Sequence, residues 1–298
     1  MRSLDELWFQ VAGTVCNLTC HHCFISCSPK NHSFEFLDFE TVDTALQQSV
    51  QFGVRDYYFT GGEPFLNPQL VRMLSRALQF GPVTVLTNGT VLKPEWLNEL
   101  RDAEAASIYS LEFRVSIDGP NADINDPVRG QGTFDRAMRG VALLSEFDFL
   151  PIITMTQTWD DARNESILDE FRQVLLEHGC SRPRLKILPR LKIGAEVDRT
   201  EGYAATERIT QEMMEDFDRD QLLCHHSRIV TSRGVYVCPI LIEAADARMG
   251  DQLLDSFDPF TMNHGACYTC YQHGAICSNS TMKRTTSESN SSAVERQA

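Results

Sequence analysis

Short hydrophobic runs alternate along the chain with longer stretches in which hydrophobic residues recur every three or four positions. The short runs are typical of buried parallel strands, and the longer spacing is typical of helices that bury one face. We therefore expect strands at residues 7–15, 54–60, 83–87, 111–117 and 151–158, and within 184–193. We expect helices from Asp38 to about Gly53, from Asn67, from about Pro94, over residues 133–147 and from Asn164.

This alternation of strand and helix repeats about six times, which argues for a parallel sheet with helices outside it. Six units are too few for a closed eight-stranded barrel, so the expected fold is α/β, a partial (βα)6 barrel. From about Leu222 the alternation stops and cysteines return. We expect a core over residues 1–221, a small cysteine-bearing module over 222–278, and a Ser- and Thr-rich disordered tail over 279–298.

Three cysteines directly follow the first expected strand, with the spacing CX3CX2C: Cys16, Cys20 and Cys23. A [4Fe-4S] cluster takes one thiolate per iron, so three ligands leave one iron open for chemistry. We favour this cluster over a zinc site, which usually takes four protein ligands. In the zinc alternative the fourth ligand comes from the nearby His21, His22, Cys27 or His32.

Three further motifs end expected strands: GGEP at residues 61–64, TNG at 87–89 and SIDGP at 116–120. Each motif alone is typical of a turn. The carboxyl ends of parallel strands meet at one edge, where ligands bind in α/β proteins, so together the motifs indicate a binding site. Gly61 and Gly62 allow close backbone approach, Glu63 offers a carboxylate to an amine, and Arg129 offers a cation to a carboxylate.

Over residues 8–193 these motifs resemble the radical S-adenosylmethionine (radical SAM) superfamily, in particular members with a C-terminal auxiliary-cluster domain of the SPASM or twitch kind. The resemblance implies that a [4Fe-4S] cluster binds S-adenosyl-L-methionine (SAM) through the methionine amino and carboxylate groups. An electron donor such as flavodoxin or ferredoxin then supplies the electron that cleaves SAM to a 5'-deoxyadenosyl radical.

The resemblance also assigns site residues. Cys16, Cys20 and Cys23 match the ligands of the SAM cluster. His22 matches the position near adenine, and Gly62 and Glu63 match the motif that receives the amino group. The remaining matches are Ser116 and Arg129 near the nucleoside and the methionine carboxylate, and Leu191 against adenine.

A second set of cysteines lies in the expected C-terminal module: Cys224, Cys238, Cys267 and Cys270. The segment between the first two reads as a β-hairpin, which brings their sulfurs together. Four thiolates fit either a zinc ion or a [4Fe-4S] cluster, and the spacing leaves both open. The resemblance favours a second, auxiliary [4Fe-4S] cluster.

This set departs from the full SPASM pattern, which has seven cysteines for two auxiliary clusters. The chain has five here, so we expect one auxiliary cluster, with Cys277 as a spare ligand or a buried thiol. Pro239 follows Cys238, where sulfatase maturases carry a proposed general-base aspartate, and this argues against formylglycine formation. Cys27 and Cys180 read as ordinary buried small residues.

The formal net charge is −14, so no diffuse basic surface is available to collect phosphates, and nucleic acid is a poor candidate partner. The net charge leaves a local basic groove open. Its hydrophobic runs fall short of the roughly 18 residues that a membrane-spanning helix needs, and no signal peptide is apparent. We expect a cytoplasmic protein without a membrane partner.

The leading hypothesis is a radical SAM enzyme of the oxidoreductase type that abstracts hydrogen from a small organic substrate, with the auxiliary cluster aiding oxidation or substrate binding. The alternative is a maturase of a ribosomally synthesised peptide. The first expected strand starts within about eight residues of Met1, so we expect no fused peptide-recognition domain before it, and a separate recognition protein stays open. A non-enzymatic alternative is an iron-sulfur or zinc-binding protein for electron transfer or interaction. The motifs at the strand ends argue against it, because an electron carrier needs no nucleoside pocket.

Overall fold

The computed structural model of the chain describes residues 3–159, 163–274 and 276. Six strands and their helices come first, in the order β1 Glu6–Gln10, α1 Phe39–Ser49, β2 Asp56–Thr60, α2 Leu70–Ala77, β3 Val83–Thr87, α3 Pro94–Ala105, β4 Leu111–Ser116, α4 Ala122–Arg129, α5 Thr133–Glu146, β5 Ile152–Thr156, α6 Asn164–Glu177 and β6 Arg184–Leu188. The C-terminal part follows with α7 Val197–Thr200, β7 Ser227–Thr231, β8 Gly234–Tyr236, β9 Arg248–Gly250 and α8 Gly265–His273.

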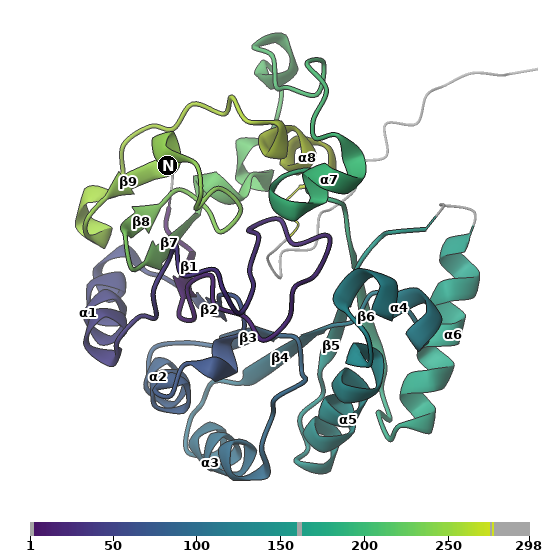
Figure 1. Cartoon of the computed structure of the whole chain (residues 1–298). Coiled ribbons are helices and arrows are strands. Elements are labelled where there is room, and N and C mark those ends of the chain that lie inside the picture. The colour runs from purple at the N-terminus through teal and green to yellow at the C-terminus, as the bar shows by residue number, and fades with distance from the viewer. Residues whose placement is uncertain (1–2, 160–162, 275, 277–298) are drawn as a thin grey trace, which may run out of the picture.

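The strands form one nine-stranded sheet in the order β6-β5-β4-β3-β2-β1-β7-β8-β9. Strands β1 to β6 pair in parallel with their neighbours in sequence, as the six βα units predict. Figure 1 shows the sheet as an open arc, with α1, α2, α3, α5 and α6 along its outer side. This confirms the predicted α/β fold, a partial barrel whose carboxyl strand ends open toward one side.

The two faces of the sheet pack into two different cores, because successive side chains of a strand point to opposite faces. Leu7 and Phe9 of β1 join the large core between the sheet and the outer helices. Trp8, between them, joins a second core inside the arc and stacks on Tyr58 with ring centroids 4.1 Å apart. The second core also contains Cys238 and other residues of the C-terminal part, so the inner face of the barrel and that part are packed together.

Strand β7 extends the barrel sheet directly, pairing in parallel with β1, and β8 and β9 add antiparallel strands beyond it. The expected hairpin between Cys224 and Cys238 is present as β7 and β8. The module predicted from residue 222 thus shares a sheet with the predicted core. Cys277 and the tail predicted over 279–298 lie outside the described residues.

Several element boundaries differ from the sequence expectation. The first strand ends at Gln10 and not at residue 15, because Gly13, at φ +53°, turns the chain back toward Gln10. Asp38 caps α1 as expected, accepting from the Thr41 N–H, whereas the helix expected from Asn67 begins at Leu70. Asn67 instead uses its side-chain amide to hold the carbonyls of Val11 and Leu37.

Helix α4 was not predicted, because its sequence ADINDPVR combines strong turn formers with an internal Pro127. Asn121 caps this helix by accepting from the Ile124 N–H, and its last turn carries Arg129. Within the described part of the chain, no helix is long and apolar enough to cross a membrane.

Candidate functional site

The loop after β1 and the carboxyl ends of β2 to β6 enclose one cleft inside the arc. Its empty space, the open mouth included, is about 1200 Å³. Predicted site residues in its wall are Cys16, Cys20, His22, Cys23, Gly62, Ser116 and Arg129. Each strand end was predicted to face the same edge, and the structure brings seven of the nine residues predicted for this site to one cavity.

The three cysteines of the loop line this cleft side by side with Cys27. Burial raises the pKa of Cys16 to about 12 and of Cys20 to about 11, so the protein alone holds these two sulfurs as thiols. A bound metal displaces the thiol protons and stabilises the thiolates. A bound cluster would therefore offset the free-energy cost of burying these negative charges. Backbone N–H groups already point at two sulfurs, from Leu18 to Cys16 at 3.4 Å and from Cys27 to Cys23 at 3.2 Å.

These soft sulfur donors suit an iron-sulfur cluster, whose four irons each take a separate ligand. Among the described residues, no group of three His, Cys, Asp or Glu side chains is arranged to hold a single metal ion. Cys27, expected to be an ordinary buried residue, is buried but lies in the wall of this cleft.

The GGE motif at the end of β2 supports the cysteine loop through its backbone. The N–H of Gly62 donates to the carbonyl of Gly13 at 2.9 Å, and that of Glu63 donates to Val15 at 3.0 Å. A Cβ on Gly62 would lie only 2.1 Å from the Val15 oxygen. Glycine is therefore required here by the approach of the cysteine loop itself.

The Glu63 carboxylate is fully buried and does not line the cleft. It accepts from the Thr87 hydroxyl at 2.7 Å and from the backbone N–H groups of Asn88 at 2.8 Å and Phe65 at 3.1 Å. Burial raises the pKa of this carboxyl to about 7. The carboxylate thus ties the end of β2 to the TNG turn after β3, while a direct contact with a cofactor stays a prediction.

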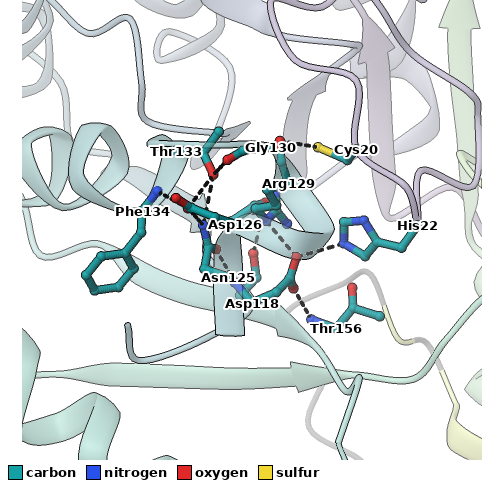
Figure 2. Close-up of polar contacts among 12 residues, drawn as sticks. Cys20, His22, Asp118, Asn125, Asp126, Arg129, Gly130, Thr133, Phe134 and Thr156 are labelled. Atoms are coloured by element: carbon teal, nitrogen blue, oxygen red, sulfur yellow. Dashed lines mark hydrogen bonds and ion pairs between the residues drawn. The ribbon is translucent and has the colours of Figure 1, made fainter. Parts of the chain in front are cut away.

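A buried carboxylate that was not predicted, Asp118, joins two predicted residues (Figure 2). One oxygen of Asp118 lies 2.8 Å from Nε2 of His22 and 2.6 Å from Nε of Arg129. The other oxygen accepts from the Thr156 N–H at 2.6 Å. Burial by itself would raise the pKa of Asp118, but the positive charge of Arg129 and the contact with His22 hold that pKa well below its usual range.

This cluster fixes side chains from three distant segments, and it leaves one polar atom unused. Nδ1 of His22 is buried and has no hydrogen-bond partner among the described residues. His22 and Arg129 both lie in the wall of the cleft, so the atoms that Asp118 does not engage are those available to a ligand. Arg129 lies at the C-terminal end of α4, and its side chain is only 10% exposed.

Ser116 lies in the cleft wall beside Thr154 of the next strand, with their hydroxyl oxygens 3.3 Å apart. Leu191 is buried in the inner core but does not line the cleft, whereas Leu188 at the end of β6 does. Leu188 is therefore the residue that the strand presents to the ligand space. Pro189 directly follows the last residue of β6, and because proline interrupts a strand pattern, the sequence alone does not fix which leucine meets the ligand space.

A second, smaller cavity lies in the C-terminal part, and its empty space, the open mouth included, is about 340 Å³. Its wall contains all four cysteines of the second predicted set, and the other lining residues are all apolar: Leu222, Leu223, Ile240, Leu241, Phe260, Met262 and Ala266. Burial raises the pKa of Cys224 and Cys267 to about 12. Cysteines that flank the β7–β8 hairpin and cysteines of α8 thus line one apolar space, which fits a group bound by thiolates.

The two cavities are neighbours in the chain as well as in space. Cys238 lines the small cavity, and the next residue, Pro239, lines the large cleft. Two consecutive residues after β8 therefore line the two cavities. In the sequence, Pro239 drew attention because sulfatase maturases carry an aspartate at this position. In the structure it is part of the cleft wall.

Comparison with known proteins agrees with this arrangement. A sequence profile described as the Radical SAM superfamily matches residues 11–168, which is more than half of the chain. The chain belongs to the radical SAM superfamily. The matched range holds the cysteine loop, the GGE motif, Ser116 and Arg129, and it ends before the second cysteine set.

Among curated proteins, the AdoMet-dependent heme synthase of Methanosarcina barkeri is 35% identical over 147 residues, 48% of this chain and 39% of that protein. Mycofactocin maturase MftC of Mycolicibacterium smegmatis is 31% identical over 171 residues, 56% of this chain and 40% of that protein. The matches thus span about two fifths of the length of each of these relatives.

Among solved structures, Streptococcus suis SuiB bound to S-adenosylmethionine superposes with a TM-score of 0.62 at 17% identity. The match covers 87% of this chain and 67% of SuiB. SuiB has also been solved bound to its precursor peptide SuiA. At this identity the likeness shows the radical SAM fold.

Proposed function

We propose that this protein reductively cleaves SAM at a [4Fe-4S] cluster held by Cys16, Cys20 and Cys23, and that it abstracts hydrogen from an organic substrate in the large cleft. The convergence of the cysteine loop and the following strand ends on one cleft carries this proposal. When bound, the cluster and SAM supply the 5'-deoxyadenosyl radical chemistry of the superfamily. An external electron donor, such as flavodoxin or ferredoxin, provides the electron.

The chain's own residues position the cofactor. The backbone of Gly61 and Gly62 lies in the cleft wall next to the cysteine loop, where it can accept the methionine amine. Arg129 is held by Asp118 in the same wall, with its remaining N–H groups available to the methionine carboxylate. In the same cleft, His22 and Leu188 bound the space for the nucleoside, and Ser116 offers a hydroxyl.

We assign the second cysteine set to an auxiliary [4Fe-4S] cluster. Four thiols face one apolar cavity, and four thiolates complete the coordination of such a cluster without an open iron. The adjacency of Cys238 and Pro239 places that cavity next to the substrate cleft, as electron transfer from a product radical requires. This supports an oxidoreductase-type reaction.

Two substrate classes have support. A ribosomally synthesised peptide is favoured by the likeness to a mycofactocin maturase and by the fold shared with SuiB, which binds a precursor peptide. A small organic molecule is favoured by the cleft itself. Residues with hydroxyl groups line it, among them Thr60, Ser116, Thr154 and Thr156, and these suit a small polar substrate.

The first experiment tests SAM cleavage. Anaerobically reconstituted protein with a chemical reductant is expected to form 5'-deoxyadenosine and methionine, measured by liquid chromatography. Replacing Cys16, Cys20 and Cys23 together by Ala should abolish this product, because the cluster ligands are lost. A matched control is Cys180→Ala, which removes a buried thiol far along the sequence from both sets. Full activity of the triple variant would refute the proposal.

The second experiment counts clusters. Fully loaded protein is expected to contain about eight irons per chain, four for each [4Fe-4S] cluster. Changing Cys224, Cys238, Cys267 and Cys270 to Ala should halve the iron while some SAM cleavage continues, with circular dichroism checking that the variant is folded. About four irons with stoichiometric zinc would instead identify the second site as structural.

The third experiment separates the substrate classes. Deuterated cell extract is divided by size into small molecules and peptides, and each fraction is incubated with the loaded protein and SAM. Hydrogen abstraction transfers deuterium to 5'-deoxyadenosine, which mass spectrometry detects. Deuterium from the peptide fraction alone would support a maturase, and deuterium from the small-molecule fraction alone would support the small-substrate reading.

A further inference from the structure

Arg228 of β7 is one of the largest fully buried side chains, with 1% of its surface exposed. Its Nε donates to the Ser256 carbonyl at 2.6 Å. Its Nη1 donates to the carbonyls of Ser227 at 2.7 Å and Cys224 at 2.9 Å, and it lies 3.5 Å from that of Val237. The guanidinium thus connects the backbones on which Cys224 and Cys238 are carried.

All these partners are neutral carbonyls. Among the ion pairs of the described residues, none joins Arg228 to a carboxylate, although the chain carries 41 Asp and Glu residues. The guanidinium of arginine stays protonated in proteins, so this buried side chain carries a positive charge. A buried charge is costly unless an opposite charge compensates it.

The cysteines of the small cavity are candidates for that opposite charge, because Arg228 contacts the backbone that carries two of them. The Arg228 guanidinium donates to the backbone carbonyl of Cys224 itself and lies 3.5 Å from the carbonyl of Val237, the residue before Cys238. As neutral thiols the cysteines offer Arg228 no counter-charge, but as thiolates bound to a cluster they would.

We propose that Arg228 is the internal counter-ion of the group bound by Cys224 and Cys238, and that it raises the reduction potential of the auxiliary cluster. This inference rests on the proposed function, in which that group is a [4Fe-4S] cluster. A thiolate-bound cluster is anionic and becomes more negative on reduction, so a fixed positive charge beside it stabilises the reduced form more than the oxidised form.

The direction of this effect suits the task proposed for the cluster. A cluster that accepts an electron from a product radical works better when its reduced form is stabilised. The surrounding cavity is lined by apolar residues, so little solvent screens the charge. Arg228 is therefore a positioning residue that acts on the substrate reaction through the cluster.

The test uses the full chain with Cys16, Cys20 and Cys23 changed to Ala, so that only the auxiliary cluster is loaded. In this background, Arg228→Gln keeps a side-chain donor but removes the charge, and Arg228→Lys keeps the charge. The readouts are iron content and the reduction potential from a redox titration followed by electron paramagnetic resonance. Arg248→Gln is the matched control, because Arg248 belongs to the same sheet extension but is exposed.

We expect Arg228→Gln to bind iron. Its ratio of oxidised to reduced cluster should be about tenfold higher than in the parent, which corresponds to a reduction potential lower by about 59 mV. Arg228→Lys should recover most of this shift, and Arg248→Gln should show none. An unchanged potential in iron-loaded Arg228→Gln would overturn the inference, as would equal loss of iron from the Gln and Lys variants, which would indicate a purely structural role. Zinc in place of iron in the parent would refute the auxiliary cluster itself.

Discussion

Replacement of Glu63 by Ala tests what the GGE carboxylate does. In the structure its oxygens accept from two backbone N–H groups, those of Phe65 and Asn88, and from the Thr87 hydroxyl. Alanine would leave both N–H groups buried without these partners. The carboxylate joins the ends of β2 and β3, so its loss should loosen the strand end on which the cysteine loop is supported.

The size of the effect follows from those contacts. Each buried donor left unpaired costs about 1–3 kcal/mol, so the two N–H groups together cost on the order of 2–6 kcal/mol. The free energy of unfolding of an ordinary domain is about 5–15 kcal/mol. The Glu63→Ala variant should therefore lose a large part of its free energy of unfolding, and SAM binding should weaken only as a consequence.

The pH dependence gives a second, independent signature. Burial raises the pKa of Glu63 from 4.5 to about 7, so the folded protein favours the protonated carboxyl. The stability contributed by this group is then fully present below pH 4.5 and is lost as the pH rises through about 7. The loss amounts to about 3 kcal/mol at about 1.4 kcal/mol per pH unit. The cost of Glu63→Ala should thus be larger in mildly acidic than in alkaline solution.

The assay is urea unfolding of wild type and variant across this pH range, with SAM affinity measured by calorimetry. Glu99→Ala, which removes an exposed glutamate of α3, is the matched control and should change stability little. An unfolding free energy equal to that of wild type, combined with SAM binding weakened ten- to a hundredfold, would refute this reasoning. That result would show a direct contact between the carboxylate and the cofactor.

Three further predictions concern the same cleft. Asp118→Asn leaves Arg129 buried without its counter-charge and should destabilise the protein by about 3–5 kcal/mol in urea unfolding; because the pKa of Asp118 is held below its usual range, this cost should shrink only in strongly acidic solution. Gly62→Ala places a Cβ 2.1 Å from the Val15 oxygen and should prevent iron loading, and normal loading would contradict the packing. Leu188→Ala should weaken SAM binding about tenfold, whereas Leu191→Ala should lower stability alone, and the reverse pattern would restore Leu191 as the nucleoside contact.

The sequence by itself determined the features that depend on near neighbours. Hydrophobic spacing located strands and helices, including β3 at residues 83–87 and the start of α6 at Asn164. The capping residue Asp38 was readable because an N-cap acts on the next three residues. The order of the motifs also predicted a common edge, since parallel strands share their direction and therefore the side on which they end.

Tertiary structure decided whatever depends on segments far apart in the chain. Asp118 pairs with His22 and Arg129 only because β4, the cysteine loop and α4 meet at the cleft, and no local pattern distinguishes it from a turn aspartate. In the same way, β7 pairs with β1 although more than 200 residues separate them, and Arg228 is buried with contacts as distant in sequence as Ser256. The directions of the Glu63 and Leu188 side chains could not be predicted from the sequence either, because they depend on the register and packing of complete neighbouring strands.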